Sequence, residues 1–238
     1  MTPTRQGSVQ IFRFAGIRVF LHWSWFVVAI FSIRNRAGEY GSLFWNAIEY
    51  LALFVIVLLH EFGHAFACRQ VGGTADQIVL WPLGGVAYVL PPPRPGAMLW
   101  SIAAGPLVNV MLVPVLSLIL ILRRFAGWPE SLPDVFDLLR NTWFINLAIL
   151  FFNLLPIYPL DGGQILRSLL WFPLGRARSL QVAALIGFVG VAGIVALAFW
   201  LRSMWIGIMA VFVFLNCRGG LLQARALARA ESRLSGKE

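Results

Sequence analysis

The chain has 238 residues, of which 59% are hydrophobic and only 12% are charged, and its formal net charge is +9. About a quarter of the residues in a soluble domain are charged, so this composition excludes an ordinary soluble protein. The positive charge is spread between long apolar runs, so we do not expect a nucleic-acid-binding protein. The composition instead indicates a chain that resides in a membrane.

The sequence has six long apolar runs, most of which approach the ~20 residues that a helix needs to cross a bilayer, while the last run is shorter. They lie at residues 19–33, 47–68, 98–122, 142–160, 182–201 and 204–217. We therefore predict an all-α polytopic membrane protein with about six transmembrane helices. One membrane domain is expected over residues 1–217, with a basic cytoplasmic tail over residues 218–238.

Loop charges predict the orientation of these spans. With six spans, thirteen of the nineteen Lys and Arg residues fall on the side of both termini and six fall on the other side. Basic loops are retained in the cytoplasm, so both termini are expected to be cytoplasmic. This pattern is typical of a multi-pass protein of a cell's inner (plasma) membrane.

The segment between the second and third spans, residues 71–96, differs from the rest. Two β-prone runs, 77–80 and 86–90, flank the turn-forming sequence PLGG, and a proline cluster follows them. We predict a small β-hairpin or re-entrant segment here. A plain surface loop is the alternative.

The sequence HEFGH lies in the second span and supplies His60, Glu61 and His64. Residues i and i+4 share one face of a helix, so both imidazoles can bind a single Zn²⁺ while the adjacent glutamate serves as a general base. A purely packing role is disfavoured, because polar groups within a span need partners. This motif therefore predicts a zinc site inside the membrane.

A catalytic zinc site usually has a third protein ligand. Two residues are candidates, His22 and Asp161, and the latter follows the fourth apolar run among prolines and glycines. If the second and fourth spans start near Trp45 and Asn141, His60 and Leu155 both lie about 21–22 Å deep at 1.5 Å per residue. His22 is on the same side of the membrane but shallower, so the residues alone leave the choice open.

Several stretches together resemble the site-2 protease family of intramembrane zinc metalloproteases. They are HEFGHA at 60–65, AAGPLVN at 103–109 and NLLPIYPLDGG at 153–163. Two more, IRVFLHWSW at 17–25 and WPLGGVAY at 81–88, resemble the branch whose larger members often carry a CBS domain. The match covers most of residues 17–167. Neither a PDZ nor a CBS domain is expected in this short form.

The resemblance implies specific roles for these residues. One Zn²⁺ per chain is bound by His60, His64 and Asp161, and Glu61 is the catalytic base. Asn153 is a candidate for binding the substrate or its oxyanion, with His22 as an alternative. Further candidates are a substrate-binding hairpin at Gly84, Gly85 and Val86, and a helix-packing or channel residue at Asn109.

The predicted function is therefore zinc-dependent hydrolysis of peptide bonds in membrane-embedded or membrane-proximal regulatory proteins. The expected partners are the lipid bilayer and such a protein substrate, with a homo-oligomer or a membrane regulator also possible. The alternative is a non-catalytic metal-binding membrane protein, either a pseudoprotease scaffold or a metal transporter. The presence of Glu61 argues against a pseudoprotease, because a structural zinc needs no base beside its ligands.

Overall fold

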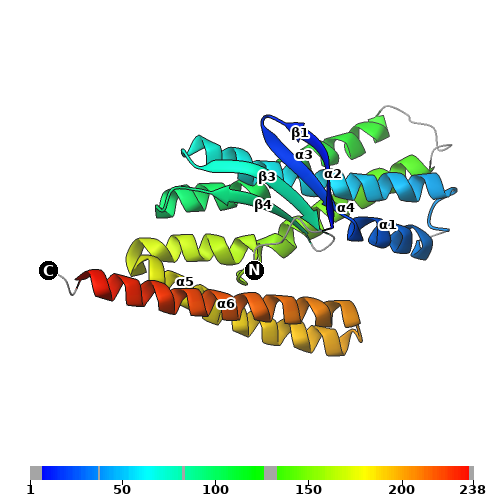
Figure 1. Ribbon diagram of the computed structural model, residues 1–238. Coiled ribbons are helices and arrows are strands. Elements are labelled where there is room, and N and C mark those ends of the chain that lie inside the picture. The colour runs from blue at the N-terminus through cyan, green and yellow to red at the C-terminus, as the bar shows by residue number, and fades with distance from the viewer. Residues whose placement is uncertain (1–6, 37, 82–83, 126–132, 236–238) are drawn as a thin grey trace. The chain divides into compact units, whose positions relative to one another are not determined.

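The computed structural model describes residues 7–36, 38–81, 84–125 and 133–235. These residues form six helices and a four-stranded sheet, shown in Figure 1. The elements, in chain order, are β1 (Ser8–Phe14), β2 (Ile17–His22), α1 (Ser24–Asn35), α2 (Leu43–Gln70), β3 (Thr74–Trp81), β4 (Gly84–Leu90), α3 (Pro95–Phe125), α4 (Pro133–Leu154), α5 (Asp161–Trp200) and α6 (Met204–Ser235). The chain divides into two compact units, Met1–Pro92 with Ala104–Phe151, and Pro93–Ala103 with Phe152–Glu238.

The sheet of the first unit has the strand order β1-β2-β3-β4. A tight turn at Ala15 and Gly16, both with positive φ, joins β1 to β2 as an antiparallel hairpin. Strand β2 then pairs with β3 in parallel, with Val19 opposite Ile78. The predicted hairpin is confirmed as β3 and β4, which are antiparallel, although its turn residues Pro82 and Leu83 lie outside the described residues.

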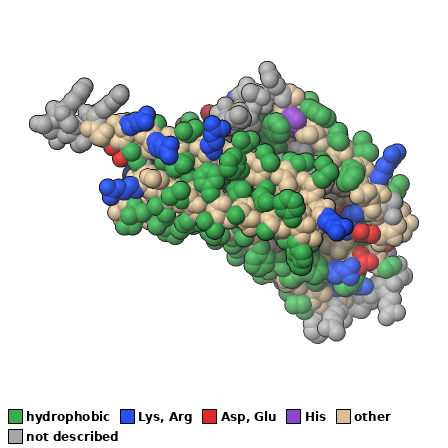
Figure 2. Space-filling model, turned by 90° about the horizontal axis from the view of Figure 1, so that it is seen from below, with side chains coloured by type: hydrophobic (Ala, Val, Ile, Leu, Met, Phe, Trp, Pro, Cys, Tyr) green, Lys and Arg blue, Asp and Glu red, His purple; other side chains and the backbone are tan. Residues whose placement is uncertain are grey.

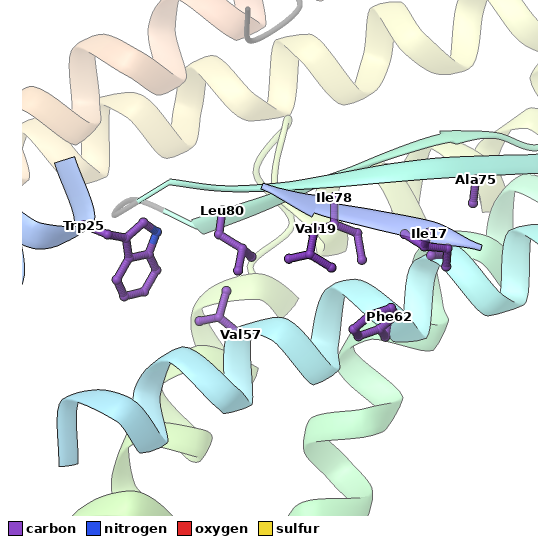
Figure 3. Close-up of a cluster of buried hydrophobic side chains, with 9 residues drawn as sticks. Ile17, Val19, Trp25, Val57, Phe62, Ala75, Ile78 and Leu80 are labelled. Carbon is purple, nitrogen blue, oxygen red and sulfur yellow. The ribbon is translucent and has the colours of Figure 1, made fainter. Parts of the chain in front are cut away.

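The core of the first unit lies between this sheet and α2. Side chains alternate along a strand, so one face of β2 and β3 is apolar and packs against the helix. The buried cluster shown in Figure 3 consists of Ile17, Val19, Trp25, Val57, Phe62, Ala65, Ala75, Ile78 and Leu80. This packing fixes the sheet along the half of α2 that carries the HEFGH motif.

Five of the six helices are long and apolar enough to cross a membrane, namely α2, α3, α4, α5 and α6. The expected span at residues 19–33 is the exception. Its first part is strand β2, and α1 has only 12 residues, about 18 Å of helix. The apolar run predicts one helix, but its first residues pair in parallel with β3 and form a strand instead.

The second unit contains two long helices, α5 and α6, which pack together. Helix α5 is broken at Gly175, which has φ 78° and follows Pro173. Helix α6 runs without interruption through the expected boundary between domain and tail at residues 217 and 218. Figure 2 shows hydrophobic side chains over both helices, with basic side chains toward the C-terminal end of α6.

Candidate functional site

Helix α2 presents the two HEFGH histidines on one buried face. His60 and His64 are 4% and 6% exposed, and their Nε2 atoms lie 3.1 Å apart. Two nitrogens that bind one tetrahedral zinc at 2.0–2.1 Å are about 3.3 Å apart, so the observed spacing fits that arrangement. The described residues therefore contain a preformed pair of nitrogen ligands.

Glycine is required where α3 passes this pair. A Cβ atom on Gly105 would lie 2.3 Å from Nε2 of His64 and 2.9 Å from Nε2 of His60. Any larger residue would occupy the space in front of the ring nitrogens. Gly63 on α2 similarly allows close approach, because a Cβ there would lie 2.7 Å from the carbonyl oxygen of Ala104.

A chain of buried amides fixes the orientation of His60. Its Nδ1 lies 2.7 Å from Oδ1 of Asn109, whose Nδ2 donates to Oδ1 of Asn146 at 2.8 Å. Asn146 in turn donates to the backbone carbonyl of Asn109 at 3.0 Å. Both asparagines are fully buried. Because Oδ1 of Asn109 can only accept, Nδ1 of His60 carries the proton and its Nε2 lone pair is directed toward His64.

Glu61 is held against strand β4. Its carboxylate accepts a hydrogen bond of 2.8 Å from the backbone N–H of Ala87, and the residue is 5% exposed. A Cβ on Gly85 would lie 2.3–2.5 Å from the Glu61 side chain. The glycine of the hairpin therefore allows the strand to pass directly along this carboxylate.

Asp161 is the first residue of α5, in the second unit, and is 9% exposed. The two glycines that follow it are tightly packed: a Cβ on Gly162 would lie 2.2 Å from the carbonyl oxygen of Leu154, and one on Gly163 would lie 2.4 Å from the backbone nitrogen of Tyr158. A carboxylate is among the ligands that zinc binds in proteins.

Two imidazoles and one carboxylate form a ligand set typical of a catalytic zinc site. The first unit supplies the two imidazoles of this set, and the second unit supplies the carboxylate of Asp161.

The other predicted site residues have different surroundings. His22 ends strand β2, stacks on Trp81 with ring centroids 3.9 Å apart, and is hydrogen-bonded to Ser24. Asn153 lies in the last turn of α4 and is partly buried. Their roles toward a substrate remain predictions from the sequence.

A second buried carboxylate, Glu49, was not singled out from the sequence. It is 4% exposed and forms an ion pair with Arg36. It also accepts hydrogen bonds from Tyr40 and from Asn141, the latter at 3.0 Å. Arg36 also donates to Glu39, and this hydrogen bond holds the pKa of Glu39 below its usual range. Glu49 and Glu39 thus share the guanidinium of Arg36.

The chain is similar to a known protein family and to several curated proteins. A profile of peptidase family M50 matches residues 48–137 and 129–197. A zinc metalloprotease of Methanocaldococcus jannaschii is 36% identical over 207 residues, which are 87% of this chain and 58% of that protein. Stage IV sporulation protein FB of Bacillus subtilis is 33% identical over 176 residues, covering 69% of this chain and 55% of that protein. The chain thus spans less than two thirds of the length of these curated relatives.

The fold of this chain is also similar to that of a solved structure. The site-2 protease from Methanocaldococcus jannaschii matches with a TM-score of 0.62 and 29% identity, covering 90% of this chain and 95% of that one. Together with the five candidate spans, this makes the protein a multi-pass membrane protein. The family profile, the relatives and the shared fold lead to one conclusion: the chain belongs to peptidase family M50, the site-2 protease family of zinc metalloproteases.

Proposed function

We propose that this protein is an intramembrane zinc endopeptidase that cleaves membrane-embedded or membrane-proximal regulatory proteins. The observation that carries the proposal is the buried carboxylate of Glu61 next to a preformed pair of histidine ligands in a membrane-span helix. A metal-storage or transport site needs the ligands but not the adjacent base.

In this proposal one Zn²⁺ is bound by His60, His64 and Asp161. When bound, zinc supplies Lewis-acid chemistry, which acidifies water and polarises a carbonyl group. Glu61 takes the proton of the attacking water on its carboxylate and passes it to the amine that leaves. The N–H of Ala87 keeps that carboxylate in place.

The test of this function uses the full chain reconstituted in liposomes together with a single-span membrane protein. We expect cleavage of the substrate, loss of cleavage after zinc chelation, and recovery when zinc is added back. Cleavage that persists in a zinc-free preparation would contradict the proposal. A protein that binds zinc but cleaves none of a panel of single-span proteins would favour the non-catalytic alternative.

Substrate binding is proposed along strand β4, at Gly84, Gly85 and Val86. Strand β4 is last in the strand order, so within the described residues one of its edges pairs with no strand. The N–H of Ala87 bonds to Glu61, so the edge groups of β4 face the proposed base. An unwound substrate segment that adds to this edge as a strand would lie beside Glu61.

The replacement Val89→Pro tests strand addition. N–H groups two residues apart point to the same side of a strand, so Val89 shares the edge with Ala87. Proline removes this donor, and loss of one hydrogen bond should lower kcat/KM by roughly 2- to 10-fold. Val89→Ala is the matched control, because it loses the same packing but keeps the N–H. Equal kcat/KM in the two variants, with zinc retained in both, would count against strand addition.

Asn109 is proposed to be a positioning residue for His60 and not merely a packing residue. Asn109→Leu removes the acceptor for Nδ1–H, and loss of such an outer partner should weaken zinc affinity by roughly 10- to 100-fold. Asn109→Asp retains an acceptor and should recover much of the affinity in a chelator competition assay. Asn46→Leu, which removes a different buried amide, on α2, is the control and should leave zinc affinity unchanged. Wild-type affinity in Asn109→Leu would refute the positioning role.

The orientation of the protein is also part of the proposal. The excess of basic residues supports cytoplasmic termini in a plasma membrane. Two termini on one side require an even number of membrane crossings, and the structure has five candidate spans. Helix α1 would therefore have to provide a sixth crossing. Membrane-impermeant labelling of cysteines introduced at each terminus checks this orientation, and labelling of either one from the outside would contradict it.

A further inference from the structure

A buried arginine in the second unit has no acidic partner among the residues that the structure describes. Arg167 lies on α5 and is 8% exposed. Its Nε atom is buried and has no hydrogen-bond partner among the described residues. A guanidinium remains protonated under all ordinary conditions, and a buried charge without a counter-ion is costly. Within the described residues this charge therefore has no counter-ion, which points to an anion from outside them.

The residues around Arg167 do not supply that anion. It interacts electrostatically with the Tyr158 hydroxyl and with a second cation, Arg176. The described part of the second unit contains two acidic residues, Asp161 and Glu231. Asp161 is six residues earlier on the same helix, hence on a different side of it, and Glu231 is exposed near the end of α6. Two guanidinium groups thus share a region without a compensating carboxylate.

The surface next to these arginines is apolar. Leu169, Phe172 and Leu174 are exposed on the same part of α5, just before the break at Gly175. Arg176 lies over the ring of Trp171, with 5.7 Å from its guanidinium carbon to the ring centroid. Tryptophan and arginine beside exposed aliphatic side chains are typical of the boundary between lipid headgroups and acyl chains. A free phosphate in water would gain nothing from the apolar surface.

We propose that Arg167 and Arg176 bind the phosphate group of an anionic phospholipid, whose acyl chains lie against the exposed residues before Gly175. A guanidinium fork matches two phosphate oxygens, and two cations favour a headgroup of net negative charge over a zwitterionic one. This inference is independent of the zinc chemistry, since it uses neither the metal ligands nor Glu61.

The experiment uses the full chain purified in a phosphorus-free maltoside detergent. Phosphatidylglycerol, phosphatidylcholine and inorganic phosphate are added separately, and bound lipid is counted by native mass spectrometry alongside the melting temperature. We expect one tightly bound phosphatidylglycerol, with an affinity at least tenfold weaker in Arg167→Gln. Arg178→Gln, an exposed arginine of the same helix, is the control and should bind as the wild type does.

A second variant separates lipid binding from a structural role. Arg167→Leu removes the unpaired charge, so without lipid it should melt at or above the wild-type temperature and show no stabilisation by phosphatidylglycerol. A lower melting temperature with unchanged lipid binding would overturn the proposal. Equal binding of phosphatidylcholine would overturn the preference for an anionic headgroup, and stabilisation by inorganic phosphate alone would overturn the assignment to a lipid.

Discussion

Asp161→Ala should remove most of the zinc from the purified protein, which is expected to hold about one zinc per chain in the wild type. A catalytic zinc usually depends on three protein ligands, and the variant would retain only His60 and His64. The loss of affinity should exceed the roughly 10- to 100-fold effect of losing an outer-shell partner. Zinc per chain is measured by elemental analysis of protein purified in detergent.

The control for this prediction is Asp76→Ala, which removes an exposed carboxylate from β3 and should leave the zinc content unchanged. Asp161→His supplies a different zinc ligand and should restore part of the binding. Zinc at the wild-type level in a folded Asp161→Ala protein would exclude Asp161 as a ligand. His22, the other candidate from the sequence, would then be replaced next, although it now stacks on Trp81.

The candidate ligands and base on α2 follow from local spacing in the sequence. His60 and His64 are four residues apart on one helix, so their shared face follows from helical periodicity alone, and Glu61 comes directly after His60 in the sequence. The helix break before Asp161 was predicted from Pro156 and Pro159, and α4 does end at Leu154, before both prolines. Such signals require no knowledge of how distant segments pack.

Strand β2 was missed because its signal is not local. An apolar run of six residues is consistent with a buried strand or with the start of a helix, and only its partner decides between them. That partner is β3, in which Ile78 pairs with Val19. Helices α1 and α2 separate the two strands in the sequence. The hairpin was predicted because its two strands and turn are consecutive in the sequence.

Two buried polar side chains of the helices were also missed. Asn146 and Glu49 lie in apolar runs, where a polar residue usually has a partner, so their presence was a usable signal. Their partners, Asn109 and Arg36, depend on how the helices are rotated, which the sequence does not specify. The close approach of Gly105 to the histidine pair depends on the same packing.

Glu61→Gln should abolish most of the cleavage while leaving the zinc content at the wild-type level. Loss of a positioned general base lowers rates by roughly 10²- to 10⁴-fold. Glutamine has nearly the same shape, and its carbonyl oxygen can still accept the hydrogen bond from the N–H of Ala87. Strand β4 and the metal ligands should therefore not move. Cleavage of the reconstituted substrate and zinc per chain are measured on the same preparation.

This pair of measurements separates a base from a ligand and from a packing residue. Glu39→Gln changes an exposed carboxylate outside the candidate spans and should affect neither quantity. If Glu61→Gln lost zinc together with activity, Glu61 would belong to the metal site itself, whereas near-normal cleavage with zinc present would require another base. The expected result is that Glu61→Gln loses cleavage but keeps its zinc, whereas Asp161→Ala loses both. This outcome would assign the proton transfer to a residue of α2 and the third metal ligand to a residue of α5.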